Sequence, residues 1–350
     1  MGHTPTVAMI DVLAPIWQRV LQRSSVRPDD NFFDLGGEPA AAVQLFSEIA
    51  KVSGRELPPL TIYQAPTMAA LAALLEQPTP TRFPTLVRMK AGALEPPVFI
   101  THGMGGSIME IFHLVKSIQT DHPIYGLQSN GFESNEEPIS RVEDTAAIYL
   151  EAMKKVQPRG PHALIGYSFG GLVMMEMAQR LRQNGERVVL LEMLETFPHN
   201  NLLPLAQRIA LFAGRVKRHS GILARLPMRK KMSYLASRSE RLNASWNHGT
   251  EAVPPETGLP DGLALERYKQ AETLALLRYR PSFYAGKINY VRAARISSSF
   301  PDDPRAIWQN LAAEFEIDTL PGDHFAMVSS HCESLASLLS RHIAAAFSGE

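Results

Sequence analysis

The chain has little that would direct it to an oxidising compartment or to a membrane. It contains a single cysteine, Cys332, among 350 residues, so it cannot form an intrachain disulfide. This excludes the disulfide-rich secreted domains and predicts a cytoplasmic protein. The N-terminus lacks the charged start and apolar core of a signal peptide. No apolar run reaches the roughly 20 residues that a membrane-spanning helix needs.

An excess of charge of one sign is also missing. The 35 Lys and Arg residues are balanced by 35 Asp and Glu residues, so the formal net charge is zero. Global charge therefore gives no reason to expect nucleic acid or another strongly charged partner. We expect neither a nucleic-acid partner nor a bound metal. The hydrophobic share of 45% is ordinary for a globular protein, and the length suggests one large or two unequal domains.

The first part of the chain has the apolar periodicity of helices. We expect helices over 7–22, from about Pro39 to Val52, and over 65–75, with a short connector at 57–63. Together they predict a small helical bundle over residues 1–76, near the lower size at which one core suffices. Proline and threonine dominate residues 77–84, which predicts an extended, semi-rigid linker.

Two motifs in this bundle resemble the carrier-protein (thiolation) domains of nonribosomal peptide synthetases. They are D-N-F-F-D-L-G-G at 30–37 and I-Y-Q-A-P-T at 62–67. The resemblance implies a four-helix carrier-like fold with phosphopantetheine as its prosthetic group. It also implies upstream synthetase modules or other carrier proteins as partners.

The resemblance fails at the attachment position. Carrier domains place a serine after Gly-Gly-Asp, whereas residues 36–40 here read G-G-E-P-A. Neither Pro39 nor Ala40 has a hydroxyl that could form the phosphodiester, and Ser47 lies too far along the helix. Two explanations remain open. The domain is a degenerate carrier kept for docking, or a serine at position 40 was replaced by alanine on purpose, which we favour slightly.

Residues 85–350 alternate strands and helices, which predicts an α/β fold with a mostly parallel sheet. The expected strands are 85–89, 97–101, 123–127, the run that begins at Ala163, 187–194, 287–293 and 315–320. Helices are expected over 143–156, after residue 171 and over 329–347.

Residues 200–276 interrupt this alternation with a helical, strongly basic stretch that we interpret as a lid over the active site. Its basic face is either a solvated surface or a docking site for an acidic carrier or the phosphate of phosphopantetheine. An amphipathic segment at a membrane surface is a weaker alternative.

The pattern G-x-S-x-G at 166–170 predicts a nucleophile elbow, because an apolar strand precedes it and a helix follows. Ser168 is then the nucleophile and needs a histidine base from late in the chain. His324 follows the last strand and is our candidate. For His102 we expect a structural role, and we expect surface positions for the remaining histidines considered, namely His219, His248 and His331.

The residues alone leave the acid open. Glu195 ends the strand after the elbow helix, and Asp302 or Asp303 follows a later strand. Glu192 is expected within a strand, and Asp323 is expected to shape the turn before His324. For the oxyanion we expect two backbone N–H donors, those of Phe169 and Met104.

Four motifs resemble the thioesterase domains that end nonribosomal peptide and polyketide synthases, within the α/β-hydrolase superfamily. They are H-G-M-G-G at 102–106, G-Y-S-F-G-G at 166–171, L-E-T-F-P at 194–198 and G-D-H-F at 322–325. The resemblance implies an α/β-hydrolase sheet with a helical lid insertion over residues 85–350. It places the acid after the strand that follows the elbow helix, which favours Glu195, with Glu in place of the usual Asp.

The two resemblances together imply a thioesterase. It would release an acyl or peptidyl chain from a phosphopantetheine thioester through a serine acyl-enzyme, by hydrolysis or cyclisation. Two alternatives stay open: a general serine ester hydrolase with a fused docking module, and a carrier-like half that acts only as a binding module.

Overall fold

The N-terminal helices form a bundle with its own core. The structure is a computed structural model, and it describes residues 7–55, 57, 59, 61–76, 84–129, 138–203, 205–209, 212–213, 262–295, 301, 303–329 and 331–349. The helices of the bundle are α1 (Val7–Val20), α2 (Pro39–Ser53), α3 (Thr61–Gln64) and α4 (Met68–Leu75). Trp17 and Phe32 are fully buried at its centre, and their rings meet edge to face with centroids 5.5 Å apart.

Local sequence explains where these helices begin and end. Pro39 occupies the first turn of α2, where a backbone N–H would have no hydrogen-bond partner within the helix. Gly54 ends the helix at a φ of 68°. Thr67 caps α4 by accepting a hydrogen bond from the Ala70 N–H at 3.1 Å. The connector predicted at 57–63 was partly wrong, because it contains the start of α3. The last helix begins at Met68 and not at residue 65.

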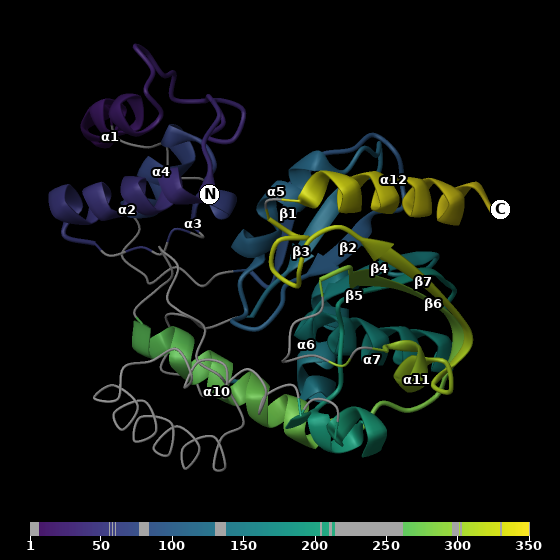
Figure 1. Ribbon diagram of the computed structural model, residues 1–350. Coiled ribbons are helices and arrows are strands. Elements are labelled where there is room, and N and C mark those ends of the chain that lie inside the picture. The colour runs from purple at the N-terminus through teal and green to yellow at the C-terminus, as the bar shows by residue number, and fades with distance from the viewer. Residues whose placement is uncertain are drawn as a thin grey trace, which may run out of the picture.

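A seven-stranded sheet forms the larger part of the molecule (Figure 1). The strands run in the spatial order β1-β3-β2-β4-β5-β6-β7, and the mostly parallel sheet predicted from the sequence is confirmed. Edge strand β1 pairs antiparallel to β3, and the other described pairings are parallel. The strands are β1 (Leu86–Lys90), β2 (Val98–Thr101), β3 (Ile124–Leu127), β4 (His162–Tyr167), β5 (Val188–Leu194), β6 (Tyr284–Ala293) and β7 (Ala312–Leu320).

Helices cover both faces of this sheet, as a buried parallel sheet requires. On one face, α12 (Cys332–Ser348) packs on α5 (Phe112–Ser117) and β5. On the other, α7 (Phe169–Gln183) packs on β4, β5 and α6 (Val142–Lys154), and the short α11 (Arg305–Trp308) packs on β7. Figure 1 shows α12 on one side of the strands and α6, α7 and α11 on the other.

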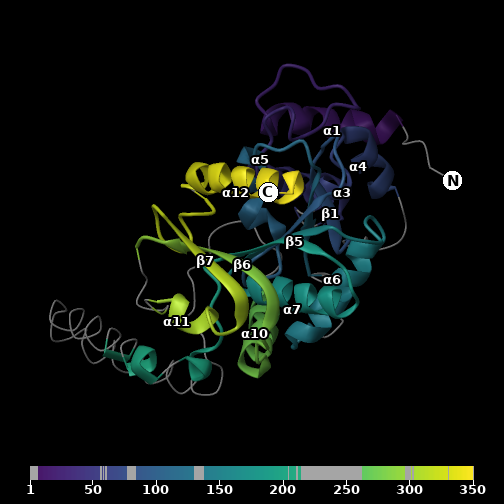
Figure 2. The ribbon, with the colours of Figure 1, turned by 90° about the vertical axis from the view of Figure 1, so that its right-hand side faces the viewer.

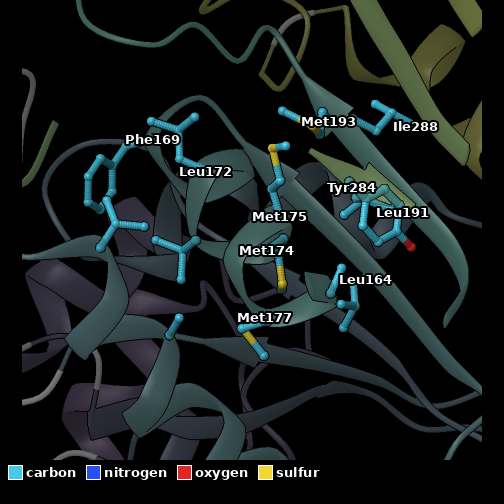
Figure 3. Close-up of a cluster of buried hydrophobic side chains, with 14 of the residues drawn as sticks. Leu164, Phe169, Leu172, Met174, Met175, Met177, Leu191, Met193, Tyr284 and Ile288 are labelled. Carbon is cyan, nitrogen blue, oxygen red and sulfur yellow. The ribbon is translucent and has the colours of Figure 1, made fainter. Parts of the chain in front are cut away.

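Helix α7 is buried on almost every side and centres the core of its face. Its methionines Met174, Met175 and Met177 lie among Leu164, Leu191 and other apolar side chains from β4, β5 and β6 (Figure 3). Met174, Met175 and Met177 are all fully buried. Because unbranched thioether side chains fill irregular gaps, they suit a helix that is enclosed by strands and by other helices.

The described part of the predicted lid contains η2 (Asn200–Leu202), a short helical stretch at 205–209, and α10 (Gly262–Arg278). Helix α10 returns the chain to β6 and packs on α6. Residues 214–261, which hold most of the basic side chains predicted for the lid, lie outside the described residues.

An aromatic cluster joins the N-terminal bundle to the sheet. Phe33 and Tyr63 from the bundle meet Phe112 of α5, with ring centroids 5.2 Å and 6.1 Å from that of Phe112. Met109 also packs against the core of the bundle, and α3 contacts β1. Figure 2 shows the bundle beside α5 and β1. The described contact between the two parts of the chain is therefore mainly aromatic and apolar.

We predict that Phe112→Ala loosens this contact. The substitution removes two aromatic pairs, each contributing about 0.5–1.5 kcal/mol beyond area burial. NMR relaxation should then show the N-terminal bundle tumbling faster than the sheet. Val52→Ala, at an exposed position of α2, is the matched control. Common tumbling of both parts in Phe112→Ala would contradict the prediction.

Candidate active site

Ser168 sits at a strained turn between β4 and α7, so the predicted strand–turn–helix context is confirmed. Its φ of 52° and ψ of −117° are uncommon for a residue with a side chain. Two backbone bonds hold the turn. The Ser168 N–H donates to the Leu194 carbonyl at 2.8 Å, and the Gly171 N–H donates to the Ser168 carbonyl at 3.1 Å. The turn therefore lies beside the end of β5.

Glycines let the strand and helix approach closely around this turn. A Cβ on Gly166 would lie 2.5 Å from the Gly171 Cα, which no side chain tolerates. A Cβ on Gly171 would collide with the side chain of Thr196, just after β5. The first turn of α7 therefore packs closely against the ends of β4 and β5. The Phe169 N–H lies at the N-terminus of this helix.

The structure brings His324 and Glu195 together, although they lie 129 residues apart in sequence. The His324 Nδ1 and Glu195 Oε2 atoms are 3.4 Å apart, and both residues are almost fully buried. The other carboxylate oxygen of Glu195 accepts the Ala293 N–H at 2.8 Å, at the end of β6. The Tyr167 hydroxyl donates to the His324 carbonyl at 2.8 Å. Both members of the pair are therefore held by groups from neighbouring strands.

The competing acids have other partners. Glu192 is fully buried within β5, where its carboxylate lies 2.9 Å from the His342 Nδ1 of α12. Asp303 is exposed and accepts the Arg305 N–H at 3.0 Å, at the start of α11. Asp323 accepts the Ala326 N–H at 3.0 Å in the turn after β7. Asp302 lies outside the described residues.

His102 is tied into the backbone rather than presented to a substrate. Its Nε2 lies 2.7 Å from the Tyr149 hydroxyl and its Nδ1 lies 2.6 Å from the Gly103 carbonyl. Burial lowers the pKa of His102 to about 4, so its ring is neutral at physiological pH. Of the other histidines, His331 precedes α12, and His219 and His248 lie outside the described residues.

The loop after β2 carries the predicted oxyanion donor Met104. Gly105 and Gly106 follow it with φ values of 113° and 75°, which a Cβ would disfavour. Two glutamates that sequence reasoning missed hold this loop. The Gly103 N–H donates to the Glu110 carboxylate, and the Gly105 N–H donates to the Glu272 carboxylate at 2.5 Å. Glu110 belongs to η1 (Ile108–Ile111) and Glu272 to α10.

At the carrier-like position, the side chains present do not fit a covalent phosphopantetheine. Helix α2 begins at Pro39, and Ala40 is exposed one residue later. The exposure suits an attachment site, but a phosphodiester needs a hydroxyl, and neither side chain supplies one. Among the residues that the structure describes, no cluster of three or more His, Cys, Asp or Glu side chains could hold a metal, and no helix could span a membrane.

Comparison with known families assigns both parts of the chain. Residues 96–343 match the family model for the thioesterase domain, and residues 11–75 match the model for the phosphopantetheine attachment site.

Two curated relatives are much longer proteins. The chain is 39% identical over 207 residues to a dimodular nonribosomal peptide synthase of Bacillus subtilis, covering 59% of this chain and 9% of that protein. It is 35% identical over 173 residues to indigoidine synthase of Dickeya dadantii, covering 49% of this chain and 12% of that protein. The chain therefore spans only a small part of the length of these relatives.

Solved structures share the fold. The four-domain nonribosomal peptide synthetase holo-AB3403 aligns over 97% of this chain and 26% of its own, with a TM-score of 0.58 and 22% identity. The NocB thioesterase domain aligns over 72% of this chain and 96% of its own, with a TM-score of 0.51 and 19% identity. With the family matches, they support one assignment: the chain belongs to the thioesterase domain family and carries an N-terminal domain of the phosphopantetheine-attachment type.

Proposed function

We propose that this chain releases an acyl or peptidyl group from a phosphopantetheine thioester in nonribosomal peptide or polyketide biosynthesis, through an acyl-enzyme on Ser168. The observation that carries the proposal is the pairing of His324 with Glu195 at the strand edge that also bears the Ser168 elbow. One of the relatives named above is a dimodular nonribosomal peptide synthase, which supports the same setting. The proposal makes the protein a serine hydrolase, and its lone buried Cys332 supports a cytoplasmic location.

Each side chain has a defined part in the reaction. His324 takes the Ser168 hydroxyl proton as the oxygen attacks the thioester carbonyl, and Glu195 stabilises the imidazolium that forms. The N–H groups of Phe169 and Met104 stabilise the oxyanion. The carbon–sulfur bond then breaks, and the thiol leaves with the proton from His324. Water or a nucleophile within the acyl chain resolves the ester, giving hydrolysis or cyclisation.

The carrier-like half does not supply its own thioester in this proposal, because Pro39 and Ala40 cannot hold the prosthetic arm. The thioester arrives as substrate from another carrier protein or an upstream synthetase module. We place this half at residues 1–76, the linker at 77–84 and the thioesterase half at 85–350, with the lid at about 200–276. A general ester hydrolase would instead process simple soluble esters as well as carrier-bound thioesters.

We predict that Ser168→Ala lowers kcat for an acyl-N-acetylcysteamine thioester by a factor on the order of 10⁶, because loss of the nucleophile disables the triad as a unit. Steady-state release of the free thiol measures this. Ser329→Ala, on the turn after His324, is the matched control and should retain wild-type turnover. Wild-type turnover by Ser168→Ala would exclude the elbow as the catalytic centre.

We predict that Glu195→Gln lowers kcat by about 10⁴-fold, since an amide cannot stabilise the imidazolium and favours the wrong tautomer. Asp303→Asn, at an exposed acid beside the start of α11, should leave kcat unchanged. The two variants are compared in the same thioester assay. If Asp303→Asn lowers kcat and Glu195→Gln does not, the acid of the triad is the one that follows β6 and not Glu195.

We predict that the chain gains no mass when it is incubated with coenzyme A and a phosphopantetheinyl transferase. Ala40→Ser should gain the mass of one phosphopantetheine, because position 40 is exposed at the start of α2. Intact-mass spectrometry reads both, and Pro39→Ser tests the neighbouring position. Labelling of the unchanged chain would overturn our account of residues 39 and 40.

A further inference from the structure

The predicted oxyanion loop is held from two sides by carboxyl groups. Gly103 and Gly105 donate their N–H groups to Glu110 and Glu272, respectively. The peptide group that carries the Met104 N–H lies between the two peptide groups fixed in this way. Its direction is therefore set by both bonds, and a shift in either would turn the proposed oxyanion donor away.

One of the two carboxyls comes from the segment that we interpret as a lid. Glu272 lies on α10, 167 residues after Gly105, and is only 4% exposed. Figure 1 shows α10 as the green helix leading from the lid segment toward α6. The bond to Gly105 is a direct contact between the returning lid helix and the proposed oxyanion loop.

The surroundings of Glu272 disfavour its ionised form on balance. Burial, which is the largest effect, and the nearby Glu110 raise the pKa of Glu272 to about 8, against the opposing effects of the Gly105 N–H bond and of Lys269 on the same helix. Tyr149 of α6 is the other titratable group that acts on this carboxyl. The second carboxylate oxygen of Glu272 has no hydrogen-bond partner among the described residues. Ionisation of Glu272 would therefore leave part of its charge unpaired in a buried site, which is costly.

Glu110 carries the charge of the pair more readily. Burial of its carboxyl raises its pKa to about 7, with the Gly103 N–H bond and Lys269 acting in the opposite direction. The residue as a whole is nevertheless exposed, whereas Glu272 is not, so water reaches Glu110 first. Tyr167 of β4 is the further titratable group that faces Glu110. As the pH rises, Glu110 therefore ionises before Glu272.

We propose that Glu272 is a positioning residue, which holds the proposed oxyanion loop through Gly105 and so couples α10 to acyl transfer. The proposal rests on the proposed thioesterase function. A neutral acid can accept the Gly105 N–H without placing a full negative charge beside the oxyanion that forms at Met104. An ionised Glu272 would repel that oxyanion, because the repulsion between like charges is strong in a buried site.

The test compares Glu272→Gln with Glu272→Ala in the thioester assay. Glutamine keeps a neutral acceptor for Gly105, so its kcat should stay near that of wild type below pH 8. Alanine removes the acceptor and should lower kcat about 10- to 100-fold with little change in KM, short of the 10²- to 10³-fold cost of losing an oxyanion donor outright. Gln270→Ala, at an exposed position of α10, is the matched control.

The pH profile gives a readout that a purely structural role would not move. Glu272 is neutral below its raised pKa and ionises above it, so wild-type kcat should fall as the pH rises through about 8. This fall should disappear in Glu272→Gln. Equal losses in the glutamine and alanine variants, or an alkaline fall that persists in Glu272→Gln, would overturn the proposal.

Infrared spectroscopy supplies a measurement that does not depend on turnover. The wild-type spectrum at neutral pH should contain the band of a buried protonated carboxyl that disappears above pH 8 and is missing from Glu272→Gln, which distinguishes it from the carboxyls of Glu110 and Glu192. Absence of that band, or a wild-type kcat that stays flat through pH 8, also overturns the proposal. Activity lost in Ser168→Ala but unaffected by any change at Glu272 would reject this inference alone, whereas wild-type activity in Ser168→Ala would reject the proposed function.

Discussion

The close approach of α7 to the ends of β4 and β5 is the constraint on which the rest of the site depends. Gly166 and Gly171 leave no room for side chains where helix and strand meet, and the chain passes through that contact only with Ser168 at a φ of 52°. The strain is maintained because the Ser168 N–H is bonded to the end of β5. Glu195 follows directly after β5, so the positions of the proposed nucleophile and acid are set by one shared strand end.

The same strand edge carries the rest of the proposed triad. Glu195 donates its N–H to the Val291 carbonyl of β6 and accepts the Ala293 N–H through its carboxylate. His324 follows β7, and its carbonyl is bound by Tyr167 of β4. Backbone and side-chain bonds thus run across the carboxyl ends of four neighbouring strands. Preorganisation of this kind, in a site shielded from water, is what electrostatic catalysis requires.

The sequence predicted an element or a site correctly where a local pattern of residues indicates it. The apolar run before G-Y-S-F-G predicted β4, the turn and α7, and the alternation of strands and helices predicted the parallel sheet. The sequence did not predict the contacts that backbone groups make with residues far away in the chain. Nothing in the sequence around Glu272 indicates a bond to Gly105, because the glycine contributes only an N–H and the two lie 167 residues apart. The resemblance to carrier domains implied four helices, but the apolar period did not locate the short helix α3, since four residues beside prolines carry no helical period.

The central claim is that Ser168 becomes covalently acylated by a thioester, and one measurement tests it directly. The chain is mixed with an acyl-N-acetylcysteamine thioester, quenched in acid, and its intact mass and peptide fragments are determined. The account predicts a single added acyl group on the peptide that contains Ser168. An acyl group on another residue, or turnover of the thioester without any acylated protein under single-turnover conditions, would contradict it.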